Sequence, residues 1–126
     1  MSQRTELARV PNLRRIILEL LLQIPKGMIT TYKDIALALG DSAAARAVGT
    51  VMANNKDPET YPCWRVVYSD GRVGNYSGQG GTDAKKSKMR NEGIAIEKGR
   101  IMDFSRVRFS DFELDPPLPE LRETQL

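Results

Sequence analysis

The sequence predicts one mainly α-helical domain with a small β wing, arranged as a winged helix-turn-helix. Three observations support this fold class. The chain has 126 residues, which fits one domain with one hydrophobic core. Two short helical patterns meet across a turn that contains Gly40. Further along, an extended run at 64–68, a turn at 69–71 and a second run at 72–73 predict a hairpin, the wing.

A first helix is expected between residues 13 and 24. Its apolar residues recur at helical spacing, while Arg14, Arg15 and Glu19 occupy the other face. The run Pro25-Lys26-Gly27 ends it, because proline and glycine both disfavour a continuing helix. The apolar face of this helix is therefore expected to form one wall of the core.

The helix-turn-helix follows. Thr31 and Asp34 form a capping-box pattern, with a hydroxyl at the N-cap and a carboxylate three residues on. Gly40 supplies the stop, and Asp41-Ser42 offers a fresh N-cap for a second helix at 43–52.

The second helix is slim. Ala45, Ala47 and Gly49 are all small, and Arg46 is its one long side chain. Small residues also favour close packing of any two helices, so the pattern alone leaves both interpretations open.

Beyond the wing lies a glycine-rich loop at 74–81, whose spacing matches neither a phosphate loop nor a dinucleotide fingerprint. A basic helix is expected at 83–92, and its cations predict a solvated face. These cations are Lys85, Lys86, Lys88 and Arg90. Residues 94–112 are expected to add a short strand or two.

Cys63 is the only cysteine, and the chain has no histidine. An internal disulfide, a standard zinc site and a Cys–His catalytic pair are therefore excluded. We expect no metal and no cofactor. A lone cysteine is often a small buried hydrophobe, but its proline and arginine neighbours in a polar loop favour another role.

Charge is unevenly distributed. Residues 1–100 carry 16 Lys+Arg against 10 Asp+Glu, and residues 101–126 carry 3 against 6, so a basic body of net +6 precedes an acidic end of net −3. We expect a polar segment at 1–10, the domain at 11–112 and a flexible, proline-rich tail at 113–126. A basic body favours polyanionic partners.

No membrane segment is expected. The most apolar stretch, Ile16 to Ile24, is short and is interrupted by Glu19 and Gln23. No secretory leader opens the chain, and a lone cysteine suits a reducing compartment. The expected location is the cytoplasm, or the nucleus in a eukaryote.

A set of motifs, taken in order, carries a family resemblance. They are Ile24-Pro25-Lys26-Gly27, Thr31-Tyr32, Ala44-Ala45-Arg46-Ala47-Val48-Gly49, Asn55, Pro62-Cys63-Trp64-Arg65-Val66-Val67 and Gly74-Asn75-Tyr76-Ser77-Gly78. Their order and spacing resemble the DNA-binding domain of O6-alkylguanine-DNA alkyltransferases, which the alkyltransferase-like proteins share. The resemblance covers residues 11–93, and residues 93–104 look more like the C-terminal part of the alkyltransferase-like proteins.

The resemblance implies a monomer that binds duplex DNA from the minor groove and extrudes a damaged guanine into a pocket beside Cys63. A slim helix bearing Ala45, Ala47 and Gly49 can enter a groove about 6 Å wide. Arg46 resembles the finger that fills the space left by the flipped base.

The same resemblance assigns the implied pocket. Tyr32 helps to rotate the nucleotide out and hydrogen-bonds the flipped base. Tyr76 stacks on that base, and the backbone amide of Ser77 faces the guanine O6.

Further roles follow from the resemblance. Pro62, Trp64 and Val66 complete the implied pocket, where backbone carbonyls accept from the exocyclic amine. Asn55 braces the turn between the recognition helix and the active-site loop. Glu92 resembles the carboxylate of a proton relay, so Cys63, Asn55 and Glu92 form the implied catalytic set.

Position 64 departs from the family pattern. Active alkyltransferases carry a histidine directly after the cysteine, and that histidine helps to deprotonate the thiol. Here the residue is Trp64, whose indole has no basic nitrogen. An unassisted thiol is only a few per cent ionised near neutral pH. Alkyltransferase-like proteins depart differently, because they lack the cysteine and bind the lesion without repairing it.

Three hypotheses remain open at this point. The first is an alkyltransferase that transfers the alkyl group irreversibly to Cys63. The second is a non-enzymatic sensor that binds O6-alkylguanine and recruits another repair protein. The third is a winged-helix regulator without lesion dependence.

Overall fold

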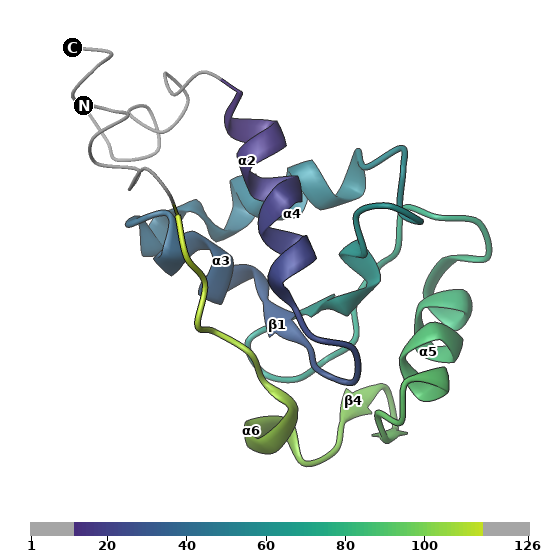
Figure 1. The fold of residues 1–126 in the computed structure, drawn as a ribbon. Coiled ribbons are helices and arrows are strands. Elements are labelled where there is room, and N and C mark those ends of the chain that lie inside the picture. Colours follow the sequence, from purple (N-terminus) through teal and green to yellow (C-terminus); the bar gives the residue numbers. More distant parts are fainter. Residues whose placement is uncertain (1–11, 115–126) are drawn as a thin grey trace, which may run out of the picture.

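The computed structural model describes residues 12–114, which form helices and two small sheets (Figure 1). The predicted fold class, mainly helical with a small sheet region, is confirmed. The predictions for residues 1–10 and for the tail beyond residue 114 lie outside the described residues. The elements in chain order are α2 (Leu13–Leu20), η1 (Leu21–Gln23), β1 (Thr30–Thr31), α3 (Tyr32–Ala38), η2 (Ser42–Ala44), α4 (Ala45–Ala53), η3 (Cys63–Arg65), β2 (Val66–Val67), α5 (Gly81–Asn91), β3 (Ile96–Glu97), β4 (Arg100–Ile101) and α6 (Phe104–Val107).

The caps predicted for the helix-turn-helix form. Thr31 is extended, and its Oγ1 accepts from the backbone N of Asp34 at 2.9 Å. Asp41 caps the second half, because its Oδ1 accepts from Ala43 N at 3.0 Å. The second helix begins as the 3-10 turn η2 and becomes α4 at Ala45.

Two hydrophobic clusters build the core. The first lies among α2, α3 and α4, which lie close together in Figure 1. The second lies against α5, β3 and β4, across from those helices. Cys63 belongs to the first cluster and Trp64 to the second, so η3 is the point where the two clusters meet.

The predicted hairpin forms only at its turn and in one bond across it, from Tyr68 N to the Arg72 carbonyl at 3.0 Å. Only Val66 and Val67 form a strand, β2, and it pairs in parallel with β1, Thr30 opposite Val66. The turn at 69–71 does form, with Gly71 N donating to the Tyr68 carbonyl at 2.9 Å. However, the second run leaves this turn toward β4, where Arg72 bridges Arg100. The antiparallel sheet is β3–β4 instead.

The C-terminal part of the described chain lies along the core. Val107 accepts from Ile29 N at 2.9 Å, and Phe109 N donates back to the Ile29 carbonyl at 2.6 Å. Arg108 between them binds the carboxylate of Asp34 with two hydrogen bonds of 2.8 and 2.6 Å. Glu113 N still donates to Gln23 Oε1, so the chain remains bonded to the domain at this residue.

Burial alone would raise the pKa of Asp34, but the hydrogen bonds from Arg108 and Thr31 outweigh it and lower the pKa below its usual value. Thr31 and Arg108 therefore both hold Asp34 in the first turn of α3. None of the helices formed by residues 12–114 is long and apolar enough to cross a membrane.

Candidate functional site

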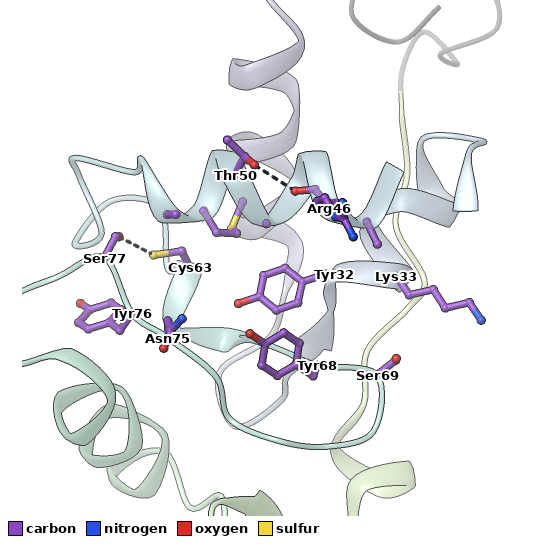
Figure 2. A pocket seen from close by; sticks show the side chains of 14 residues that line it. Tyr32, Lys33, Arg46, Thr50, Cys63, Tyr68, Ser69, Asn75, Tyr76 and Ser77 are labelled. Carbon is purple, nitrogen blue, oxygen red and sulfur yellow. Dashed lines mark hydrogen bonds between the residues drawn. The ribbon is translucent and has the colours of Figure 1, made fainter. Parts of the chain in front are cut away.

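A cavity of about 540 Å³ lies beneath α4 (Figure 2). Its walls come from the start of α3, one face of α4, the first residue of η3 and the loop at 68–77. The lining residues are Tyr32, Lys33, Ala45, Arg46, Gly49, Thr50, Met52, Ala53, Cys63, Tyr68, Ser69, Asn75, Tyr76 and Ser77. Four segments of the chain thus share one hollow.

Cys63 contributes its thiol to this cavity while being only 4% exposed. Its Sγ lies 3.6 Å from Ser77 Oγ, and Ser77 Oγ donates to the Asn55 carbonyl at 3.1 Å. Because the serine has one hydroxyl proton and gives it to Asn55, the thiol is the donor in the Cys63–Ser77 contact. Ser77 therefore contacts the sulfur through its side chain.

Asn55 is buried at the end of the turn that follows α4. Its Nδ2 donates to the Tyr61 carbonyl at 2.9 Å, and its Oδ1 accepts from Asp57 N at 3.0 Å. These bonds tie the end of α4 to the loop that carries Cys63. The catalytic role of Asn55 stays a prediction.

Two predicted tyrosines line the cavity. Burial, followed by the nearby Tyr68 and Cys63, raises the pKa of Tyr32 to about 12, so its hydroxyl remains a proton donor at neutral pH. Burial, with Cys63 and Glu59, also raises the pKa of Tyr76. The Tyr76 ring depends on Gly78, because a Cβ there would lie 2.3 Å from Tyr76 Cζ.

One face of α4 roofs the cavity with small residues. Ala45 and Gly49 line it directly, and a Cβ on Gly49 would come within 3.9 Å of the Tyr32 ring. Ala47 is partly exposed on the same helix. Arg46 projects from this roof, and its guanidinium makes no hydrogen bond or ion pair with any residue between 12 and 114. The helix therefore presents one cation on a slim surface.

Comparison with known proteins identifies the family of this chain. Residues 12–94 match the family model described as 6-O-methylguanine DNA methyltransferase, DNA binding domain. The chain belongs to this family. It is 48% identical over 103 residues to a bifunctional methyltransferase/endonuclease of Thermoplasma volcanium, covering 82% of this chain and 32% of the relative. It is 40% identical over 85 residues to the methylated-DNA--protein-cysteine methyltransferase of Homo sapiens, covering 68% of this chain and 40% of the relative.

Solved structures of the family show the same fold. The chain matches Mycobacterium tuberculosis OGT in complex with DNA at a TM-score of 0.60 and 32% identity, over 64% of this chain and 49% of that one. It also matches S. pombe Atl1 in complex with damaged DNA containing O6-carboxymethylguanine, at a TM-score of 0.68 and 22% identity. That match covers 86% of this chain and 98% of the other. The chain spans about a third of the length of the bifunctional relatives.

Three residues that the resemblance to this methyltransferase family assigns to the pocket lie behind its wall. Pro62, Trp64 and Val66 are all buried, and none of them lines the cavity. The Trp64 ring belongs to the second cluster, with the guanidinium carbon of Arg65 4.7 Å and Lys88 Nζ 5.9 Å from its centroid. These residues support the cavity from the core.

The carboxylate of Glu92 binds Arg65 and Gly27. Its Oε2 accepts from Arg65 at 2.6 Å, and its Oε1 accepts from Arg65 Nε at 3.2 Å and from Gly27 N at 3.0 Å. Arg65 also donates to the Ile24 carbonyl at 2.9 Å. The carboxylate thereby locks the chain after α2 to the end of η3, and its role in a relay to Cys63 stays a prediction.

Lys85 is a buried cation near Cys63 that the sequence did not reveal. The expected solvated position is wrong, because Lys85 is fully buried and its Nζ donates to the Asn75 carbonyl at 2.9 Å. Burial lowers the pKa of Lys85 to about 7, opposed in part by Cys63. A signal was present in the sequence: Met89, four residues on, shares its helix face and is also buried.

Proposed function

We propose that this protein recognises O6-alkylguanine in duplex DNA and transfers the alkyl group irreversibly to Cys63. One observation carries the proposal: the sulfur lies in the wall of a cavity that opens beneath a slim helix from which Arg46 projects. A nucleophile, aromatic walls and a groove-sized helix are the parts that such a reaction needs.

The DNA is bound through α4. Its small face fits a minor groove about 6 Å wide, and Arg46 takes the place of the base that leaves the stack. Extrusion costs a few kcal/mol, and less for a mispaired alkylguanine, so part of the selectivity comes from the duplex. The flipped base then lies between Tyr32 and Tyr76, where the neutral Tyr32 hydroxyl can donate to it.

The thiol needs a proton acceptor that Trp64 cannot supply. We assign this role to Lys85, because its pKa of about 7 leaves much of the amine neutral at physiological pH and its charge interacts with Cys63. After the proton moves to Lys85, Ser77 Oγ can turn its hydrogen toward the thiolate 3.6 Å away.

The transfer itself balances without a cofactor. The thiolate attacks the alkyl carbon, the S–C bond forms and the C–O6 bond breaks with its electrons on guanine. The Lys85 ammonium returns the proton to the guanine anion. The net result is a thioether on Cys63 and an unmodified guanine, so each molecule reacts once.

Intact-mass measurement tests the proposal. After long incubation with a duplex containing O6-methylguanine, we expect the protein to gain one methyl group in place of a hydrogen. Cys63→Ala should gain nothing, and neither should the wild type with an unmodified duplex. An unchanged wild-type mass would reject alkyl transfer.

Trp64 supports a second candidate, a lesion sensor, because the relay histidine is absent. A sensor keeps its mass but binds the alkylated duplex more tightly than the normal one, whereas a plain regulator shows no such preference. A sensor also needs a second repair protein, and the relatives named bifunctional methyltransferase/endonuclease favour a nuclease. We further propose that the protein acts as a monomer, and that it works in the cytoplasm or, in a eukaryote, in the nucleus, where its DNA substrate is found.

A further inference from the structure

Tyr68 is an aromatic residue of the cavity wall to which the proposed function gives no role. It directly follows β2, and 37% of its surface is exposed. It lines the same hollow as Cys63, Tyr32 and Tyr76, beside Ser69. In Figure 2 the rings of Tyr32 and Tyr68 lie one above the other, across the cavity from Arg46 and α4.

The ring is held in place by its neighbours. Its centroid lies 5.5 Å from that of Tyr32, with the planes tilted by 49°. The guanidinium carbon of Arg72 lies 4.8 Å from the Tyr68 centroid, and Arg72 Nε is itself bound to Asp70 Oδ2 at 2.7 Å. Gly74 leaves room for the ring, since a Cβ there would lie 2.9 Å from Tyr68 Cε2.

These contacts hold the ring in a fixed position while a third of its surface stays open. A preorganised aromatic ring of this kind binds a nucleotide at low entropic cost, because no side-chain freedom is lost when the ligand arrives. The tyrosine therefore has the properties of a stacking surface, and the cavity it faces is the one that would receive an extruded base.

We propose that Tyr68 is a third aromatic contact for the extruded nucleotide and that it supplies affinity that depends on extrusion but not on the alkyl group or on Cys63. The inference rests on the proposed function, because it concerns a nucleotide turned into the same pocket. The contact is made by the ring, and the hydroxyl is not required for it.

Binding measurements in a Cys63→Ala background test this without interference from the reaction. The probes are two duplexes of one sequence, with O6-methylguanine or guanine at the same position, titrated at fixed salt because phosphate contacts make affinity salt-dependent. The variants are Tyr68→Ala, Tyr68→Leu and Tyr68→Phe. Met102→Ala is the matched control, since Met102 is 40% exposed but does not line the cavity.

We expect Tyr68→Ala and Tyr68→Leu to weaken binding of the methylated duplex by about tenfold to a hundredfold, as alanine substitution does for base–aromatic stacking. Tyr68→Phe should bind as the parent does, and Met102→Ala should change neither duplex. Leucine keeps the apolar bulk, so the Leu variant separates a stacking ring from a space-filling one even if the Ala variant folds poorly.

The outcomes separate this inference from the proposed function. If the parent shows no preference for the methylated duplex, lesion recognition itself fails. If the parent shows the preference and Tyr68→Leu binds the methylated duplex as tightly as the parent does, only the role of Tyr68 is overturned. A Tyr68→Phe variant as weak as the Leu variant would also overturn it, because the hydroxyl rather than the ring would then carry the binding.

Discussion

Replacing Lys85 with methionine is expected to stabilise the protein and to slow its reaction. Lys85 is fully buried, and burial lowers its pKa from 10.5 to about 7. A pKa difference of this size corresponds to a cost of about 5 kcal/mol in folding free energy, at about 1.4 kcal/mol per pH unit. Methionine has a similar shape and no charge, so it removes this cost but also loses the bond to Asn75, which contributes about 1–2 kcal/mol. We expect a net gain of about 3 kcal/mol at pH 7.

The pH dependence of unfolding provides the assay. Between pH 7 and 10.5 the unfolded chain still binds the Lys85 proton that the folded protein has released. Wild-type stability therefore rises with pH in this window, by up to about 1.4 kcal/mol per unit from this group. Denaturant unfolding of both proteins between pH 7 and about pH 9 should show the wild type steadily approaching Lys85→Met in stability.

The neighbouring Lys86→Met is the control, because Lys86 is only partly buried, and its unfolding free energy should change by about 0.5 kcal/mol or less. In single-turnover experiments the wild-type transfer rate should rise through pH 7, while Lys85→Met should be slow throughout. A Lys85→Met protein that is less stable at pH 7, with a pH-independent difference from the wild type, would refute the reasoning.

Three further substitutions test the roles of Arg108, Gly78 and Arg46. Arg108→Ala should lower the unfolding free energy by about 3 kcal/mol, because it leaves the buried Asp34 carboxylate without its main partner. Since the pKa of Asp34 is lowered by folding, the wild-type advantage should be full above pH 3.8 and fade as the pH falls further, and an advantage that grows in acid would contradict this. Gly78→Ala should push the Tyr76 ring aside and weaken binding of the methylated duplex by about tenfold with little change in melting temperature, whereas unchanged affinity would show that the ring is not a contact. Arg46→Ala should reduce both lesion binding and alkyl transfer by at least about tenfold, measured by titration and intact mass, while leaving stability unchanged because the side chain is exposed.

Local chemistry explains which parts of the fold could be predicted. The cap of Thr31 on Asp34 and the turn at Asp70-Gly71 are set by residues within three positions of one another, so their hydrogen bonds can be inferred from the sequence. The pairing of Thr30 with Val66 joins distant segments through two-residue strands that leave no periodic pattern. That is why the hairpin was predicted instead of the parallel pair.

The cavity could be predicted only in part, because local motifs mark some of its residues while tertiary contacts place others. Motifs in the sequence indicated Cys63, Tyr32 and Tyr76, and the structure brings all three to one hollow. Lys85 was missed because Met89 is the one large apolar residue of α5, so no apolar stripe marks the buried face. Its burial follows from packing against the loop at Asn75, which is a tertiary contact.

The geometry of η3 explains why a tryptophan can replace the expected histidine. A 3-10 turn has about three residues per turn, so successive side chains leave it in directions about 120° apart. Cys63 accordingly faces the cavity, while Trp64 enters the second hydrophobic cluster and Arg65 turns to Glu92. A side chain at position 64 therefore packs in the core, where tryptophan contributes a large apolar surface. The amine whose charge interacts with Cys63 belongs to Lys85, on α5. Under the proposed function, packing at position 64 and proton transfer from Cys63 are carried by different residues, so a tryptophan at position 64 is compatible with the proposed chemistry.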